Sequence, residues 1–165
     1  MIKLFLNVRK LYFKIIYCNH VSEFSITSLD FKEGEEIPKK FGYKFENKTP
    51  NIQFHNMPSQ SSSWALIMDD PDAMAAVGKV WVHWLVCNIS SEIENIQSGI
   101  HGKTDFGETN YGGPAPPNGR HTYIFKAYAL DMKLDLKEDY SKQDLEDAMK
   151  GHIIAEAKLT GTFTS

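Results

Sequence analysis

The chain has 165 residues, of which 42% are hydrophobic and 24% charged, so it can form one globular domain with a substantial core. Its 18 Lys and Arg and 21 Asp and Glu give a net charge of -3, with no basic block. This balance argues against a nucleic-acid binder that works by neutralising phosphates. The two cysteines, Cys18 and Cys87, lie far apart in apolar segments, so we expect free thiols and a reducing, cytoplasmic location.

Residues 1–22 form an apolar extension that is interrupted by four basic residues, Lys3, Arg9, Lys10 and Lys14. No run approaches the roughly 20 apolar residues that a membrane-spanning helix needs. An unbroken apolar centre and a small-residue cleavage site, which mark a signal peptide, are not evident. We therefore expect no integral membrane segment. Residues 1–22 are interpreted as an extra strand, an amphipathic segment or the result of an early start codon, before a single domain over 23–165.

The segments that follow alternate apolar and polar residues, as β-strands do. Residues 24–31 give a weak strand signal and residues 51–57 a clearer one. Residues 64–68 and 80–89 are apolar runs, and the second is apolar on both faces, which is typical of a central strand. Strict alternation places Val82, Trp84 and Val86 on one face of that strand. His83 then lies on the other face, either buried or at the floor of a pocket.

Residues 111–119 contain three prolines and three glycines and are predicted to form a rigid loop. Glycine permits close backbone approach there, and proline limits motion. A strand over 121–130 follows, with His121 and Tyr123 on one face.

The last part of the chain predicts one helix and one strand. Ser141 and Asp144 fit a capping box, and four residues recur at helical spacing: Leu145, Ala148, Met149 and His152. Residues 155–163 alternate as a final strand. Many short strands and one clear helix predict a mainly β, sandwich-like fold with few helices. The stretch over 90–110 is expected to be loop.

Several polar side chains could form a small site. Asp69-Asp70-Pro71-Asp72 follows a strand, and although it could be only a turn, one Asp could hold a histidine in a pocket. His83 alone is more often a core histidine, whereas His121 follows a Gly/Pro loop. Two histidines, an Asp, a Tyr and free amides could bind an anion. A metal site with His83, His121 and Asp70 is a weaker alternative because no metal-ligand spacing is present. A hydrolytic triad is weaker still.

At this point the motifs resemble a known family. Asp70-Pro71-Asp72-Ala73, Trp81–Val86, Tyr111–Gly119 and His121-x-Tyr123 are similar to motifs of the phosphatidylethanolamine-binding protein family. The motifs are more similar to its bacterial and archaeal branch of Raf-kinase-inhibitor-like proteins, and the segment over 145–157 also resembles that branch. The resemblance covers about residues 23–163.

The resemblance implies a β-sandwich with a Greek-key sheet, a few peripheral helices and a small anion pocket. In that family the pocket receives phosphate-like anions or the phosphoryl head group of phosphatidylethanolamine. By motif, the expected ligand-binding residues are Asp70, Asp72, His83, Tyr111, Gly113, Pro116, His121 and Tyr123. No catalytic residue, metal or cofactor is implied.

Two positions depart from the family pattern, because Met74 stands where Pro is usual and Thr122 where Arg is usual. Thr carries no charge and no fork of donors. Alternation also directs Arg120 elsewhere. We therefore expect an altered or weaker anion site in which Asp72 has lost its partner.

The expected function is non-enzymatic binding of a phosphate-like anion or phosphoryl head group. Such binding should weaken as pH rises through the histidine pKa, which is near 6.5 for an unperturbed ring. The alternative is an interaction protein that inhibits or regulates a kinase or protease through the pocket rim. One fold can carry many functions, so the choice between anion binding and regulation of a kinase or protease depends on the site and not on the fold.

Overall fold

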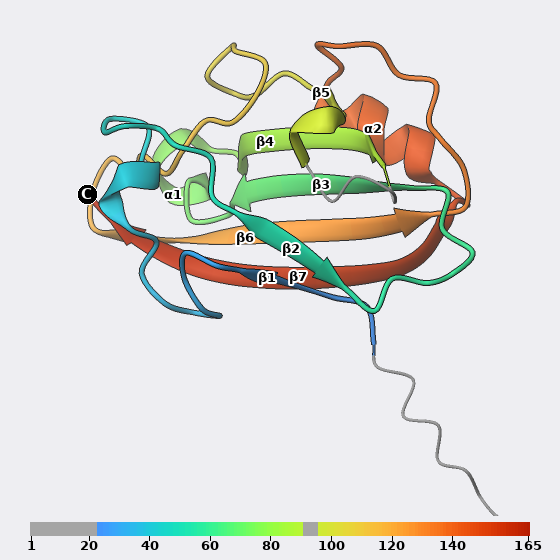
Figure 1. Ribbon diagram of the computed structural model, residues 1–165. Coiled ribbons are helices and arrows are strands. Elements are labelled where there is room, and N and C mark those ends of the chain that lie inside the picture. Colours follow the sequence, from blue (N-terminus) through green and yellow to red (C-terminus); the bar gives the residue numbers. More distant parts are fainter. Residues whose placement is uncertain (1–22, 91–95) are drawn as a thin grey trace, which may run out of the picture.

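The computed structural model describes residues 23–90 and 96–165, which form two antiparallel β-sheets with short helices around them (Figure 1). The elements in chain order are β1 (Ser25–Ser28), η1 (Lys39–Phe41), β2 (Ile52–His55), β3 (Ser63–Asp70), α1 (Met74–Val77), β4 (Trp81–Ile89), η2 (Ile96–Ser98), β5 (Ile100–His101), β6 (Arg120–Leu130), α2 (Lys142–Met149) and β7 (Ile153–Thr164). The mainly β class with few peripheral helices is therefore confirmed. Residues 1–22, including Cys18, lie outside the described ranges, so the N-terminal extension and the single domain over 23–165 stay predictions.

The larger sheet has the strand order β5-β4-β3-β6-β7. β3, β4 and β5 are consecutive antiparallel neighbours, and β6 returns through a long connection to pair with the other edge of β3. This is the order of a Greek key, as predicted. The connection that closes it contains the Gly/Pro loop, so the loop lies at the end of the sheet where β6 begins.

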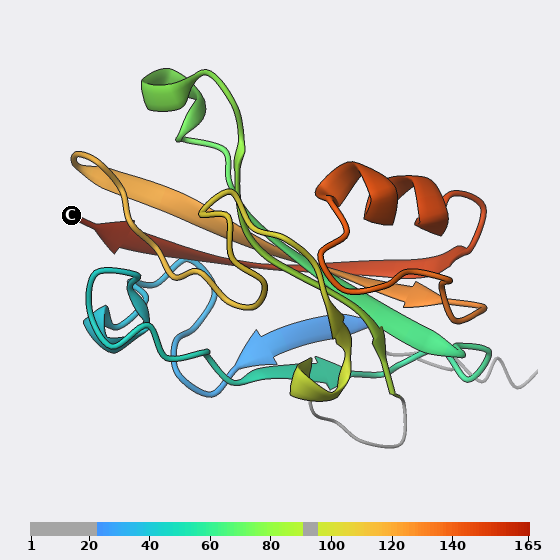
Figure 2. The ribbon, with the colours of Figure 1, turned by 90° about the horizontal axis from the view of Figure 1, so that it is seen from above.

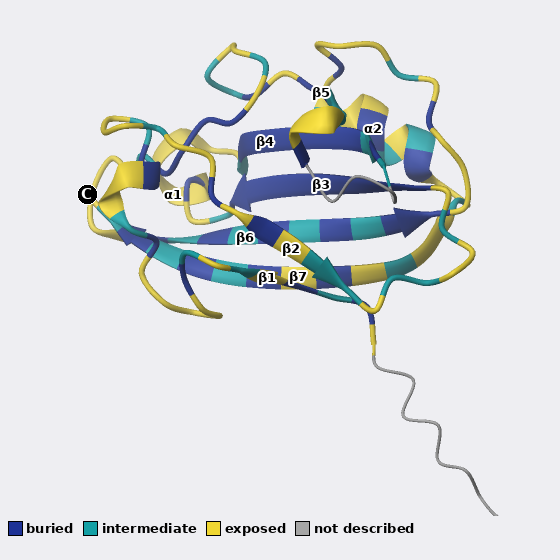
Figure 3. Ribbon diagram, viewed as in Figure 1, coloured by how far each residue is buried: buried dark blue, intermediate teal, exposed yellow. Residues whose placement is uncertain are grey.

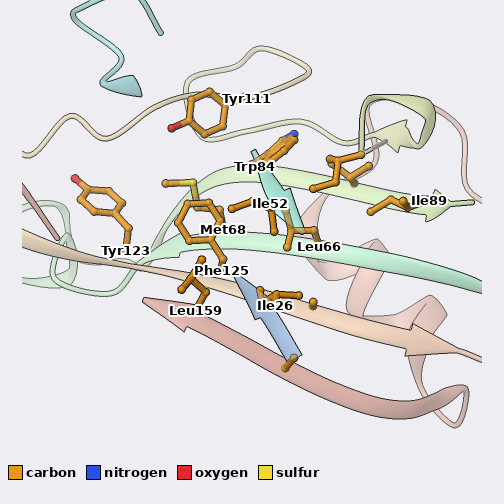
Figure 4. Close-up of a cluster of buried hydrophobic side chains, with 14 of the residues drawn as sticks. Ile26, Ile52, Leu66, Met68, Trp84, Ile89, Tyr111, Tyr123, Phe125 and Leu159 are labelled. Atoms are coloured by element: carbon orange, nitrogen blue, oxygen red, sulfur yellow. The ribbon is translucent and has the colours of Figure 1, made fainter. Parts of the chain in front are cut away.

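Both faces of the larger sheet are covered, which explains why its central strands are apolar on both sides (Figure 2). β1 and β2 form the second, smaller sheet and pack on one face, and α2 packs on the other. Figure 3 shows β3 and β4 buried along most of their length. The core between the sheets contains Ile26, Ile52, Leu66, Met68, Trp84 and Phe125 (Figure 4). Trp64 belongs to the same cluster. The core under α2 contains Ala65, Ile67, Val82, Leu85, Leu145 and Met149.

β4 departs from strict alternation at His83. Met68 pairs with Trp84 and the next residue of β3, Asp69, pairs with Val82, so His83 is the extra residue of a β-bulge. Trp84 therefore packs between the sheets, whereas Val82 packs under α2. The prediction that Val82 and Trp84 share a face is wrong because the bulge shifts the alternation by one residue. The bulge also places His83 on the same side as Trp84.

α2 begins at the predicted capping box. Ser141 Oγ accepts from the Asp144 amide at 3.2 Å, and the Asp144 carboxylate accepts from the Ser141 amide at 2.8 Å. Leu145 and Met149 are buried against the sheet as expected. The helix ends at Met149, so the prediction that His152 continues its apolar face is wrong.

The remaining segments show smaller differences from expectation. The stretch predicted to be only loop contains η2 and the two-residue strand β5, which pairs with the end of β4. Cys87 is a free, buried thiol, as expected. Within the two described ranges, no helix is long and apolar enough to cross a membrane.

Candidate functional site

Two adjacent carboxylates end β3 and lie on opposite faces of the sheet. The strand continues through Asp70, so Asp69 and Asp70 are strand residues and not part of a turn, as one interpretation had them. They are 1% and 3% exposed. Since successive strand residues point to opposite sides, Asp69 lies toward α2 and Asp70 toward the other face.

Asp70 holds a histidine from the neighbouring strand. Its Oδ2 lies 2.7 Å from Nδ1 of His121, and its Oδ1 accepts from the Ala73 amide at 3.0 Å. A carboxylate can only accept in this contact, so the His121 proton is on Nδ1. The expectation that one Asp of the acidic stretch holds a histidine is confirmed.

His83 is oriented by the Gly/Pro loop. Its Nδ1 lies 2.7 Å from the Gly112 carbonyl oxygen and 3.1 Å from that of Gly113, so Nδ1 carries a proton that it donates. The ring is buried, and burial lowers the pKa of His83, although the two carbonyls and Asp70 act in the opposite direction. Nε2 is the ring nitrogen left for a ligand.

The Gly/Pro loop is held in place by the segment after η1. The Gly113 amide donates to Asn47 Oδ1 at 2.8 Å, and Asn47 Nδ2 donates to the Tyr111 carbonyl at 3.3 Å. A Cβ at Gly113 would lie 2.0 Å from the Phe41 carbonyl oxygen, so glycine is required there. The backbone that approaches this glycine closely is therefore that of Phe41.

A cavity of about 150 Å³ opens between α1 and the Gly/Pro loop. His83 and Asp70 lie in its wall together with Trp81 and Phe106. The Phe106 ring meets both His83 and Trp81 edge to face, with ring centroids 5.4 Å apart in each pair. The other lining residues are Ala73, Ala76, Val77, Ala115 and Pro117, so the described wall contains no lysine or arginine.

Two buried donors next to this cavity have no hydrogen-bond partner in the described part of the chain. They are the Tyr123 hydroxyl and Nε1 of Trp81. The Tyr123 ring meets His83 edge to face at 5.1 Å. Burial raises the pKa of Tyr123, and so do the charge of Asp70 and a hydrogen bond with its side chain, whereas the Ala115 backbone acts in the opposite direction, so the hydroxyl is protonated and can donate. Its contacts with Asp70 and Ala115 are thus too long or too poorly aligned to satisfy it. Buried polar groups without partners are rare and call for an explanation.

The structure brings together four of the predicted site residues. Asp70 and His83 line the cavity, His121 is held by Asp70, and Tyr123 packs on His83. Gly113 and Pro116 are buried in the loop that orients His83.

The other two predicted residues have different surroundings. The Tyr111 hydroxyl donates to the Phe41 carbonyl at 3.0 Å, and its ring meets Trp84 edge to face in the core. Asp72 is exposed, and its Oδ2 accepts from the Thr122 amide at 2.7 Å.

The prediction that Asp72 has lost its partner is therefore wrong, because a backbone amide serves where a side chain was expected. Arg120 extends away from the site: its Nε lies 3.6 Å from Glu36 and its Nη2 donates to Thr162 Oγ1 at 2.6 Å. Because Thr162 is the cross-strand partner of Thr122, Arg120 shares the face of Thr122, so alternation is not what separates the two.

Asn47 and Phe106 were missed by sequence reasoning. Both lie in irregular segments without hydrophobic periodicity, so no pattern marks them. Among the residues that the structure describes, no group of three or more His, Cys, Asp and Glu side chains could hold a metal ion.

Comparisons with known proteins agree with this geometry. A family model described as "Phosphatidylethanolamine-binding protein" matches residues 27–164. A UPF0098 protein of Chlamydia muridarum is 40% identical over 145 residues, which cover 84% of this chain and 97% of the relative. The crystal structure of a phosphatidylethanolamine-binding protein homologue from Chlamydia trachomatis superposes with a TM-score of 0.81 at 36% identity, covering 87% of this chain and 98% of that one. Escherichia coli YbcL superposes with a TM-score of 0.79 at 27% identity, covering 87% and 99%.

Proposed function

The chain belongs to the phosphatidylethanolamine-binding protein family, in its bacterial and archaeal branch, and from this premise we propose that its cavity binds a phosphate-like anion or phosphoryl head group. In this proposal His83, His121, Asp70 and Tyr123 form the polar part of the site. Gly113 and Pro116 shape the loop, and Asp72 and Tyr111 support it from outside the cavity. The proposed role is binding without catalysis, and the cytoplasmic location stays a prediction.

The observation that carries the proposal is the convergence of unpartnered polar atoms on one small cavity. In the cavity wall, Trp81 Nε1 is a donor without a partner in the described chain and His83 has one free ring nitrogen. The Tyr123 ring packs on His83 next to the cavity, and its hydroxyl is close to Asp70 and the Ala115 backbone. The volume of about 150 Å³ suits a phosphoryl group but not the acyl chains of a lipid.

An NMR titration tests this proposal. Inorganic phosphate, then phosphoethanolamine, is added at pH 6 while the imidazole signals of His83 and His121 are followed. We expect saturable shifts in both rings and none in a His121→Ala variant. His55, which contacts Thr27 Oγ1 at 2.7 Å on β2, is an internal control whose signals should not move. An absence of shifts up to millimolar ligand would remove the proposal.

A second candidate function is regulation of a kinase or protease through the rim. It is favoured by Met74 and Val77, which are each 51% exposed on α1, in a connection that projects from the sheet (Figure 2). Exposed apolar side chains beside a pocket are typical of interaction sites. A partner that co-purifies with the native chain, is lost in a Met74→Asp, Val77→Asp variant and is kept when His83 is changed would support this function.

A further inference from the structure

The cavity presents a hydrogen-bond acceptor where an anion site would be expected to present a cation. We infer that it selects an oxyanion that carries a hydroxyl group, inorganic phosphate or a phosphate monoester, because His83 Nε2 accepts a hydrogen bond from that hydroxyl. This inference rests on the proposed function and adds which form of the phosphoryl group fits.

The tautomer of His83 follows from its contacts. Carbonyl oxygens of Gly112 and Gly113 have no proton to give, so the imidazole proton must be on Nδ1. In the neutral ring Nε2 then carries a lone pair and accepts. The ring is 2% exposed, and its burial disfavours the charged form. His83 therefore offers the cavity a lone pair at neutral pH.

The charged groups around His83 also favour a ligand that carries a proton. Asp70 faces it from β3, Tyr123 faces it from β6, and His121 lies behind Asp70. Asp69 turns to the opposite face of the sheet, where Lys126 pairs with it. The described cavity wall has no lysine or arginine, and the nearby Lys79, whose Nζ lies 5.0 Å from the Trp81 ring centroid, is paired with Asp105. A fully deprotonated oxyanion would therefore meet the carboxylate of Asp70 without a cation in the wall. A proton on the ligand reduces that repulsion.

The remaining polar groups suit the other oxygens of such a ligand. Trp81 Nε1, in the cavity wall, can donate to them, and so can the Tyr123 hydroxyl, which lies within reach of the Ala115 backbone. Ala115 and Trp81 both line the cavity. Donors for the charged oxygens and one acceptor for a hydroxyl match a protonated phosphoryl group.

This polarity distinguishes ligands of similar shape. Sulfate resembles phosphate in size but is fully deprotonated at neutral pH, so it cannot donate to His83. A phosphodiester, the linkage of a phospholipid head group, has no hydroxyl on phosphorus either. A phosphate monoester has one only below its second pKa, which is near 6. Inorganic phosphate keeps at least one up to neutral pH and above.

The experiment uses the full chain and four probes: inorganic phosphate, methyl phosphate, dimethyl phosphate and sulfate. Affinities are measured by NMR titration at pH 6, 7 and 8. We expect phosphate to bind at least ten-fold more tightly than sulfate at pH 7, and methyl phosphate at least ten-fold more tightly than dimethyl phosphate at pH 6. Methyl phosphate should weaken between pH 6 and 8 more than inorganic phosphate does.

A His83→Gln variant should reduce the phosphate-to-sulfate affinity ratio toward one, because an amide can turn to donate as well as accept. The matched control is His152→Gln, whose imidazole contacts Asp131 at 2.9 Å outside the site and should leave the ratio unchanged. If His83→Gln does not fold, ring nitrogen NMR of the native chain decides. A neutral ring protonated on Nδ1 at pH 7 supports the inference, and a doubly protonated ring overturns it.

The outcomes separate this inference from the function on which it rests. Equal binding of phosphate and sulfate overturns the inference and leaves the anion-binding function intact. Binding of none of the four probes overturns both.

Discussion

Asp69 and Asp70 are neighbours on β3, equally buried, and differ in what faces them. Asp69 Oδ2 lies 2.6 Å from Nζ of Lys126 and 2.9 Å from Nζ of Lys142, on the α2 side of the sheet. Asp70 meets no lysine or arginine among the described residues and contacts the His121 imidazole and the Ala73 amide. At the end of β3, the aspartate on one face of the sheet therefore pairs with two lysines, whereas the aspartate on the other face holds a histidine.

Asp69 acts as a structural carboxylate, whereas Asp70 belongs to the candidate site. The charge of Asp69 is compensated by two ammonium groups, which tie β6 and α2 to β3. The charge of Asp70 is compensated by hydrogen bonds only, beside a cavity with unpartnered donors. Both oxygens of Asp70 are hydrogen-bonded, whereas Oδ1 of Asp69 has no partner among the described residues, so Asp70 is distinguished by the cavity beside it and not by a missing partner.

The largest expected effect comes from breaking the Asp69 side. In a Lys126→Met, Lys142→Met variant, a carboxylate that is 1% exposed loses both countercharges, and we expect about 3 kcal/mol less free energy of unfolding in urea. Phosphate affinity should not change. The control, Lys133→Met with Lys137→Met, removes two exposed lysines. A loss confined to phosphate binding would contradict the division between the two faces.

A smaller effect on stability, with a large effect on binding, is expected on the Asp70 side. His121→Ala removes a 2.7 Å hydrogen bond to a buried carboxylate, which should lower the free energy of unfolding by about 2 kcal/mol. Phosphate affinity should fall at least ten-fold. His55→Ala, at the surface of β2, is the control for both measurements. Unchanged phosphate affinity in His121→Ala would remove His121 from the site.

The pH dependence of the free energy of unfolding should depend on His83, which lines the cavity on the Asp70 face of the sheet. Since burial lowers the pKa of His83, the folded chain binds fewer protons there than the unfolded chain, so stability is full above about pH 6.5 and falls as pH drops through that value. One such group changes the free energy of unfolding by at most about 1.4 kcal/mol per pH unit. His101, whose pKa burial also lowers, contributes with the same sign.

Urea unfolding at pH 5, 6 and 7 measures this slope. In His83→Gln the slope should be smaller but not zero, because His101 remains. A slope that the variant leaves unchanged would show that His83 does not titrate differently in the folded and unfolded chains.

The smallest effect is expected from Thr122→Arg. Asp72 accepts from the backbone amide of residue 122, which an arginine keeps. Phosphate affinity should change less than two-fold and the urea midpoint should not move measurably. A ten-fold gain in affinity would mean that the side chain at this position acts on the site after all.

Much of this arrangement could be predicted from the sequence. Alternation and turn residues located the main strands, and the motifs indicated the Greek-key order that brings Asp70 beside His121. Period-two alternation also separated His121 from Thr122 correctly. These features depend on local patterns along single segments, which a sequence displays directly.

The missed features depend on contacts between segments. The bulge at His83 arises from pairing with β3, and the sequence of β4 alone does not predict it. Asn47 holds the Gly/Pro loop and Phe106 lines the cavity from irregular stretches. Their roles follow from where the loops meet, so a single chain without its fold does not reveal them.

The Greek-key connection has a consequence for how this protein acquires its site. Asp70 and His121 are 51 residues apart in sequence, and they meet only when β6 has returned to the edge of β3. β3 and β4 are joined by a short connection and can pair early, whereas closing a long loop is entropically costly and slow. Ligand binding therefore becomes possible only after β6 has paired with β3, so phosphate added during refolding should stabilise the chain with β6 in place without accelerating the steps that precede strand return.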